Sequence, residues 1–272
     1  MYKIRKAEKL ADKIYLMDVE APRVAKHCEP GQFVIVKMDD KGERIPLTIC
    51  DYDREEGTIT IVFQTVGAST EKMAQLKAGD SFRDFTGPLG CPSELISEDI
   101  ESLKNKKILF VAGGVGAAPV YPQVKWMHAH GIDVDVIVGS KTKDMLILEK
   151  EMEAVAGNYY PCTDDGTYGH AGMVTSMIEE LAEQGKKVIV TTTTHIAFEP
   201  ERPFARDGEL NKVRENLRKY GYTVAACMEK REEKSWKKPE NIQGSSGTHC
   251  SASEEQNKSG KLFTEIGRAS CR

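Results

Sequence analysis

Residues 106–131, with the sequence KKILFVAGGVGAAPVYPQVKWMHAHG, decide the fold class of this chain. A continuous apolar run leads directly into a cluster of glycines, and a helical stretch follows from Ala117. A short apolar run that ends on glycines is typical of a fully buried strand of a parallel sheet. Strand-like and helical stretches continue to alternate up to a helix that ends near Gly185, and this alternation predicts βαβ units in an α/β domain.

The first 90 or so residues show a different sequence pattern. Short runs rich in Val, Ile, Thr and aromatic residues are separated by clusters of Gly, Pro and Asp, and these runs are KIYLMDVEA (13–21), GQFVIVKMD (31–39), RIPLTICDY (44–52) and GTITIVFQTV (57–66). Many short strands at regular spacing predict an antiparallel barrel or sandwich. We therefore expect two domains, a β domain over residues 1–98 and an α/β domain over residues 106–228, joined by a polar linker at about 92–105.

Composition and charge exclude several classes of protein. The net charge of −4 gives no reason to expect nucleic acid as a partner. No apolar run approaches the roughly 20 residues that cross a bilayer, and the N-terminus has no signal-peptide core. We therefore expect a cytoplasmic protein without a membrane partner. The seven cysteines are scattered singly, which predicts free thiols and no metal site.

The strongest chemical signal is the glycine-rich turn that follows the apolar run. Gly113, Gly114 and Gly116 allow the backbone to approach a diphosphate closely, and the helix that begins near Ala117 presents its N-terminus to negative charge. The spacing differs from the GxGxxG of a Rossmann fold. The alternative interpretation is a tight turn that serves packing alone.

Two stretches of the β domain also suit a phosphate. Arg44 precedes Thr48 by four residues, and a guanidinium binds phosphate in a bidentate way. The second stretch, VGAST at 66–70, opens a short helix with amides and hydroxyls near its N-terminus. Each has a simpler interpretation, with Arg44 as an ordinary edge-strand arginine and Ser69 or Thr70 as an N-cap.

Five stretches occur together in one order: RIPLTI (44–49), VGAST (66–70), GPLG (87–90), AGGVGAAP (112–119) and TDDGTYGHAGMVT (163–175). In order and spacing they resemble the ferredoxin reductase-like superfamily. Within it they are most similar to the electron-transfer subunits of dihydroorotate dehydrogenase, of sulfide dehydrogenase and of the NADH-dependent ferredoxin:NADP oxidoreductase. The resemblance covers about residues 1–185.

The resemblance implies a barrel that binds FAD and an α/β domain that binds a nicotinamide nucleotide, NAD(P)H. The residues expected to line the flavin are Arg44, Pro46, Leu47 and Thr48. The residues expected to bind the FAD diphosphate are Gly67, Ala68, Ser69 and Thr70. The nicotinamide cofactor is expected to face Gly113, Gly114, Gly116 and Ala117, with Asp164, Asp165 and Gly166 closing the nucleotide site. The pattern departs from the superfamily at Leu47, which replaces a stacking tyrosine, and in the longer spacing between Arg44 and Thr48.

The function implied by the resemblance is hydride transfer between NAD(P)H and FAD, with electrons passed to a larger catalytic subunit or to ferredoxin. We predict no acid–base catalytic residue, because the cofactors carry this chemistry. Lys141 and Lys143 follow the second predicted strand of the α/β domain, where they suit either a 2′-phosphate or solvent, so NAD and NADP both remain open. A second hypothesis is a flavin- or nucleotide-binding module without catalysis.

Beyond about residue 185 the resemblance stops. Relatives present four cysteines that bind a [2Fe–2S] cluster, whereas Cys227, Cys250 and Cys271 are each more than 20 residues apart, so the cluster ligands are absent. Residues 229–272 are nearly devoid of apolar side chains and are predicted to be a disordered tail. The stretch VTTTTHI resembles P-loop accessory proteins, but the GxxxxGK loop is missing. The final IGRASCR resembles a translated sequencing adapter, which suggests a chimeric reading frame; the alternative is a divergent natural C-terminus.

Overall fold

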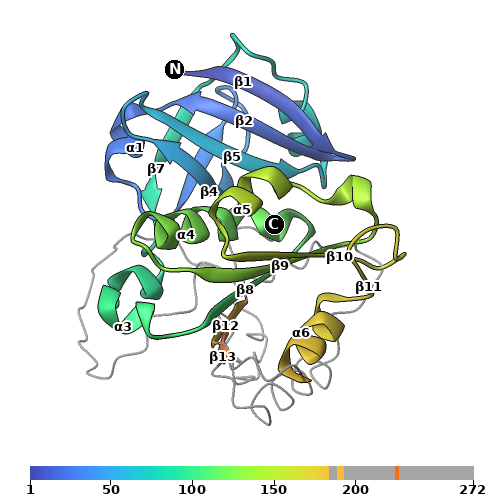
Figure 1. Ribbon diagram of the computed structural model, residues 1–272. Helices are drawn as coiled ribbons and strands as arrows, with labels where there is room; N and C mark the ends of the chain where they lie inside the picture. The colour runs from blue at the N-terminus through green and yellow to red at the C-terminus, as the bar shows by residue number, and fades with distance from the viewer. Residues whose placement is uncertain (184–188, 193–223, 227–272) are drawn as a thin grey trace, which may run out of the picture.

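The computed structural model describes residues 1–183, 189–192 and 224–226. Figure 1 shows a curled antiparallel sheet above a parallel sheet with helices on both of its faces. Four of the sequence-based predictions lie outside the described residues: the disordered tail at 229–272, the chimeric junction near 185, the stretch VTTTTHI beyond its first residues, and the three cysteines at 227, 250 and 271.

The N-terminal sheet is a near-closed antiparallel barrel, as the short strands predicted. Its strands are β1 (Tyr2–Ala11), β2 (Ile14–Glu20), β3 (Phe33–Lys37), β4 (Ile45–Asp53), β5 (Thr58–Gln64), β6 (Ser81–Phe82) and β7 (Asp84–Leu89). Their order is β6-β1-β2-β5-β4-β3-β7. Arg83 alone separates β6 from β7 in the chain, although these strands stand at opposite ends of the order, so the sheet has to curl until its edges approach each other.

Successive side chains of the barrel strands point alternately into the barrel and out of it, and both sets include apolar residues. On β5, Ile61 points into the barrel core, whereas its neighbour Val62 belongs to a different buried cluster outside the barrel. On β2, Met17 points inward and Leu16 outward in the same way. Successive side chains of a strand face opposite sides, so one outer face of the barrel is apolar and has to be covered.

The second sheet has six strands, and every neighbouring pair is parallel. They are β8 (Ile108–Gly113), β9 (Val134–Ser140), β10 (Asn158–Thr163), β11 (His170–Ala171), β12 (Ile189–Thr192) and β13 (Val224–Ala226), in the order β11-β10-β9-β8-β12-β13. The chain proceeds from β8 to β10 on one side and returns to β12 on the other. The direction therefore reverses between β8 and β12, and open α/β sheets bind ligands at such a switch point.

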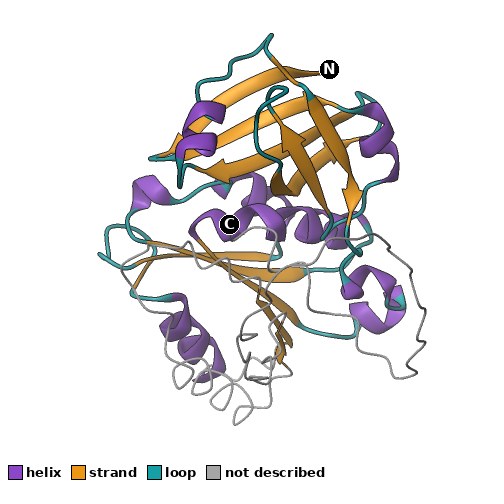
Figure 2. Ribbon diagram, turned by 180° about the vertical axis from the view of Figure 1, so that it is seen from behind, coloured by secondary structure: helices purple, strands orange, loops and turns teal. Residues whose placement is uncertain are grey.

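Helices cover both faces of the parallel sheet. Figures 1 and 2 show α4 (Ala117–Ala129) and α5 (Glu149–Val155) between the sheet and the barrel, and α6 (Val174–Glu183) on the far side. Strand β8 serves both layers, because Phe110 lies in the cluster with α4 while Leu109 lies with α6. This two-sided burial explains why β8 reads as a continuous apolar run.

The predicted linker is more ordered than its polar composition suggests. It contains a 3-10 helix, η1 (Glu94–Ser97), and a short helix, α3 (Ile100–Lys104). Asp99 caps α3 by accepting a hydrogen bond from the Ser102 amide at 2.9 Å, and Leu103 is fully buried. Helices this short escape a pattern search that needs windows of 11–18 residues.

The barrel carries two short helices of its own. The sequence predicted a short helix opened by the stretch at 66–70, and α2 (Ala68–Met73) is that helix. The other helix, α1 (Pro22–His27), was not predicted; it begins on a proline and buries Val24 and Ala25 in the barrel core.

A single apolar cluster joins the two domains. It combines the outward-facing Leu16, Cys50 and Val62 of the barrel with buried residues of α4 such as Tyr121 and Val124. The apolar outer face of the barrel is thus covered by α4, the helix that follows the glycine-rich turn (Figure 1).

Candidate functional site

Hydrogen bonds bring the two phosphate-suited stretches of the barrel together. Glu43, two residues before β4, accepts a hydrogen bond from the Ser69 hydroxyl at 2.5 Å. Lys72, on α2, forms an ion pair with Asp39. The first turn of α2 therefore lies beside the segment that carries Arg44, although the two are more than 20 residues apart in the sequence.

Arg44 is accessible to an anion. Its side chain is 58% exposed, and its Nη1 donates a hydrogen bond to Asp84 Oδ2 at 2.8 Å. This hydrogen bond lowers the pKa of the Asp84 carboxyl. An exposed pair of this kind contributes little free energy, so a phosphate can replace Asp84 as the partner of Arg44 at small cost.

The strand β4 presents its predicted flavin-lining residues on two sides. Pro46, Leu47 and Thr48 are half-buried and pair with residues 33–35 of β3. Leu47 packs against the barrel core. Pro46 and Thr48 alternate with Leu47 and share the outer face with Cys50, which is buried beneath the α/β domain.

The turn at 66–70 uses Thr70 as an internal cap. The Thr70 hydroxyl accepts hydrogen bonds from the amides of Val66 at 2.9 Å and Gly67 at 3.2 Å. A Cβ built on Gly67 would meet no atom of the described residues within 4 Å. Gly67 is the N-cap of α2 and Thr70 closes a capping box from the third helical position, so the expectation that Ser69 or Thr70 is the N-cap was wrong. Open space remains in front of the turn.

The glycine turn after β8 also keeps open space in front of it. A Cβ at Gly113 or Gly114 would meet no atom of the described chain within 4 Å, and Gly114 has φ +52°, in the left-handed region that favours glycine. Gly116 and Ala117 are buried instead. The turn forms a 3-10 helix, η2 (Gly114–Gly116), that contacts β5 of the barrel.

Three strands of the parallel sheet end level with this turn. The register pairs Gly113 with Gly139 and Gly139 with Cys162. Cys162 is fully buried, and burial raises the pKa of its thiol to about 11. It is therefore a protonated core thiol.

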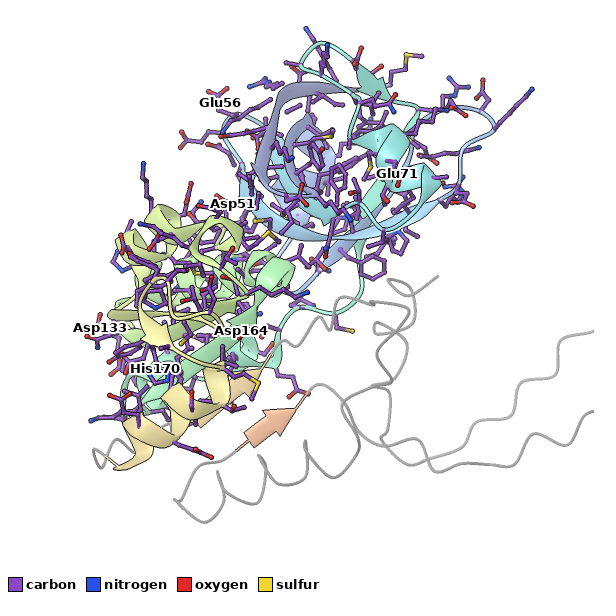
Figure 3. The ribbon with its side chains drawn as sticks, turned by 90° about the vertical axis from the view of Figure 1, so that its right-hand side faces the viewer. Asp51, Glu56, Glu71, Asp133, Asp164 and His170 are labelled. Carbon is purple, nitrogen blue, oxygen red and sulfur yellow. The ribbon has the colours of Figure 1, made fainter. Side chains whose placement is uncertain are left out.

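The loop after β10 is tied to the end of β9 through its backbone. The Asp164 amide donates to the Ser140 carbonyl at 3.0 Å, and the Asp165 amide to the Lys141 carbonyl at 3.3 Å. Gly166 has φ +68° and completes the turn. These predicted nucleotide residues are exposed, and they lie at the same edge of the sheet as the glycine turn; Figure 3 labels Asp164 there.

Two positions that support this edge were not foreseen as site residues. A Cβ on Gly139 would lie 2.4 Å from Val174 Cγ1, so glycine lets α6 pack against the end of β9. His170 lies 2.8 Å from the Ser176 hydroxyl and 3.1 Å from Glu180 Oε2, and these contacts hold the 164–172 loop against α6. The sequence offers a weak signal for Gly139, since it ends an apolar strand run.

The described residues provide neither a metal-ion cluster nor a membrane-spanning helix. No group of three or more His, Cys, Asp or Glu side chains among them could hold a metal ion. None of their helices is both long and apolar enough to cross a membrane.

An antiparallel barrel followed by a parallel sheet with a reversal at its glycine turn defines the class of ferredoxin reductase-like proteins. The solved structure of an NADH-dependent reduced ferredoxin-NADP oxidoreductase matches with a TM-score of 0.64 and 33% identity, covering 71% of this chain and 67% of that chain. No protein-family model matches the chain.

Curated relatives agree with the fold. The electron transfer subunit of dihydroorotate dehydrogenase B (NAD(+)) from Fusobacterium nucleatum is 33% identical over 182 residues, which are 66% of this chain and 68% of that protein. An uncharacterized protein from the adh 3′ region of Clostridium beijerinckii is 62% identical over 188 residues, 69% of this chain and 64% of that protein. The chain belongs to the family of ferredoxin reductase-like electron-transfer subunits, and it spans about two thirds of the length of these relatives.

Proposed function

We propose that this chain is a flavoprotein oxidoreductase subunit that transfers electrons between NAD(P)H and FAD. The observation that carries the proposal is the meeting of two nucleotide turns at one barrel strand. The glycine turn of the parallel sheet contacts β5, and β5 leads directly into the 66–70 turn of the barrel. Hydride transfer requires two redox rings in contact, and this packing supports such a contact.

The barrel residues fit an FAD molecule. Open space lies in front of Gly67, and the first amides of a helix such as α2 have no intrahelical partner. Arg44 supplies an accessible guanidinium next to this turn, because Glu43 bonds to Ser69. We therefore propose that residues 67–70 and Arg44 hold the diphosphate. Pro46 and Thr48, on the outer face of β4, would border the flavin, with Leu47 supporting them from the core side.

The parallel sheet fits a nicotinamide nucleotide. Gly113 and Gly114 leave space for a close approach of the backbone, and the turn lies where the strand order reverses. Asp164, Asp165 and Gly166 would close this site from the end of β10. Gly116 and Ala117 are buried, so in this proposal they shape the turn and start α4 rather than touch the ligand through side chains.

The chain contributes geometry to the proposed reaction. Bound FAD supplies the hydride acceptor and the capacity for onward one-electron transfer. The protein residues orient the two nucleotides and cover the barrel side of the site. One relative is named as the electron transfer subunit of an NAD(+)-linked dehydrogenase, and the solved structure is named as an NADH-dependent reduced ferredoxin-NADP oxidoreductase. We propose that electrons pass on to a larger subunit or to ferredoxin.

The test is spectroscopic. Purified protein supplied with FAD should be yellow, and NADH or NADPH added without oxygen should bleach it. A yellow protein that neither coenzyme bleaches would instead be a flavin-binding module, the alternative function. Protein that takes up no FAD would contradict both, and comparing the two coenzymes decides between NAD and NADP.

A further inference from the structure

Helix α4 connects the two proposed cofactor sites mechanically. Its first residue, Ala117, follows the glycine turn, and its body packs on β4, the strand that carries Thr48. Any movement of α4 along β4 would therefore change the distance between the glycine turn and the outer face of β4. Apolar contacts alone hold such a helix loosely in register, because the hydrophobic effect is non-directional.

An ion pair links α4 directly to β4. Lys125 Nζ lies 2.7 Å from Asp51 Oδ1 and 2.8 Å from Asp51 Oδ2, so the ammonium bridges both carboxylate oxygens. Asp51 belongs to β4 and Lys125 to α4, and the two are 74 residues apart in the sequence. The side chains of Asp51 and Lys125 are 25% and 45% exposed, so this pair is somewhat more sheltered than Asp84 and Arg44, at 33% and 58%. Figure 3 labels Asp51 where the barrel meets the α/β domain.

The surroundings restrict the pair further. The Lys125 ammonium lies 5.9 Å from the centre of the Tyr121 ring, one turn earlier on α4. Cys50, next to Asp51, is buried in the cluster shared by the two domains. On another side of the helix, the Ser93 hydroxyl donates to the buried Gln123 side chain at 2.8 Å, which ties α4 to the linker.

We propose that Asp51 and Lys125 are positioning residues that set the distance between the flavin and the nicotinamide during hydride transfer. This inference rests on the proposed function. The pair touches neither proposed nucleotide turn. Its loss should therefore slow the hydride-transfer step without weakening the binding of FAD or of the coenzyme. A misplacement of about 1 Å can cost on the order of 100-fold in rate.

The experiment compares full-length, FAD-loaded variants by anaerobic stopped-flow reduction with the coenzyme that bleaches the wild type. Asp51→Asn and Lys125→Met should each lower the limiting rate of flavin reduction by about 10- to 100-fold, with the coenzyme dissociation constant and FAD content within about threefold of wild type. The double variant should be no slower than the slower single one, because coupled residues are not additive. Lys125→Arg should restore most of the rate.

Lys104→Met is the matched control, since it removes a lysine from an exposed pair with Glu101 inside α3. Its limiting rate should equal that of the wild type. Equal rates in Asp51→Asn, Lys125→Met and wild type would overturn the inference, as would a loss confined to coenzyme affinity.

If the neutral variants do not fold, Asp51→Glu keeps the charge and lengthens the side chain by one methylene. A lower limiting rate in Asp51→Glu supports the inference, and an unchanged rate overturns it. Failure of the proposed function is seen separately, in the wild-type protein. If neither coenzyme bleaches the wild type, the proposed function is wrong, and this inference is wrong with it.

Discussion

The two proposed nucleotide turns of this protein are built differently. In the barrel, contacts to charged side chains hold the proposed site together, through the pair of Arg44 with Asp84 and the hydrogen bond from Ser69 to Glu43. In the parallel sheet, backbone holds it, through the amide of Asp164 and the conformation of Gly114. In the barrel turn, Arg44 can thus exchange Asp84 for an incoming anion. In the sheet turn, the backbone conformation is set before any ligand binds.

The difference follows from where each turn lies. The barrel turn joins exposed segments, where ion pairs are cheap to break. The glycine turn joins β8 to α4, both deeply buried, and its shape is set by core packing. We therefore expect substitutions in the sheet turn to act on the rate of reduction, and substitutions in the barrel turn to act on FAD affinity.

The largest effect is expected from Gly114→Val. A β-branched side chain disfavours φ +52° and fills the open space in front of the turn. Reduction of bound FAD should fall by about 100-fold or more, while the yellow colour remains. Gly131→Val is the matched control, because Gly131 also has positive φ and open space but lies in the loop after α4. Equal losses in both variants would mean that backbone strain, not the site, is responsible.

Arg44→Ala should weaken FAD binding by about 10- to 100-fold, the range for a charge-assisted hydrogen bond worth roughly 1.5–3 kcal/mol. Dissociation constants from flavin fluorescence titration measure this loss. Arg5→Ala is the control, since Arg5 is an exposed arginine of β1 paired with Glu20 at 2.9 Å. An Arg44→Ala protein that binds FAD as tightly as wild type would return Arg44 to the role of an ordinary edge-strand residue.

Buried thiols should make the fold sensitive to alkali. The pKa of Cys162 is about 11 in the folded protein, against 9.0 for an unperturbed thiol. Its stabilisation is complete below pH 9.0 and is lost as pH rises through about 11. Urea titrations at several pH values should show the free energy of unfolding falling over this range. In Cys162→Ala this fall should be smaller by roughly 2–3 kcal/mol; an unchanged slope would contradict the assignment.

The smallest effect concerns thiol reactivity. Among the cysteines of the described residues, Cys91 is exposed, whereas Cys28, Cys50 and Cys162 are buried. Burial raises the pKa of the Cys28 thiol to about 12. Iodoacetamide at pH 8 should modify Cys91 and spare the other three, and all four should react in urea. Peptide mass spectrometry reads out the result, and rapid native labelling of Cys162 would show that the sheet edge opens.

Local chemistry made much of the fold predictable. The strand that ends at Gly113 and the strands of the barrel form from runs of neighbouring residues, so their patterns are visible in the sequence. The helix α1 and the ordered linker were missed, because five- and six-residue helices contain too few turns for a periodic pattern. The site residues at 44–48, 67–70, 113–117 and 164–166 came from the family resemblance, and their contacts with FAD and NAD(P)H stay predictions.

The sequence by itself determined the order of the main strands and helices and the position of the glycine turn, since both follow from residue types within one or two turns of chain. Only the tertiary structure decided which elements meet. The pairing of Asp51 with Lys125 and the fit of Val174 over Gly139 join residues 35 to 74 positions apart. Such contacts depend on how α4 and α6 pack against the two sheets, and no local periodicity encodes that arrangement.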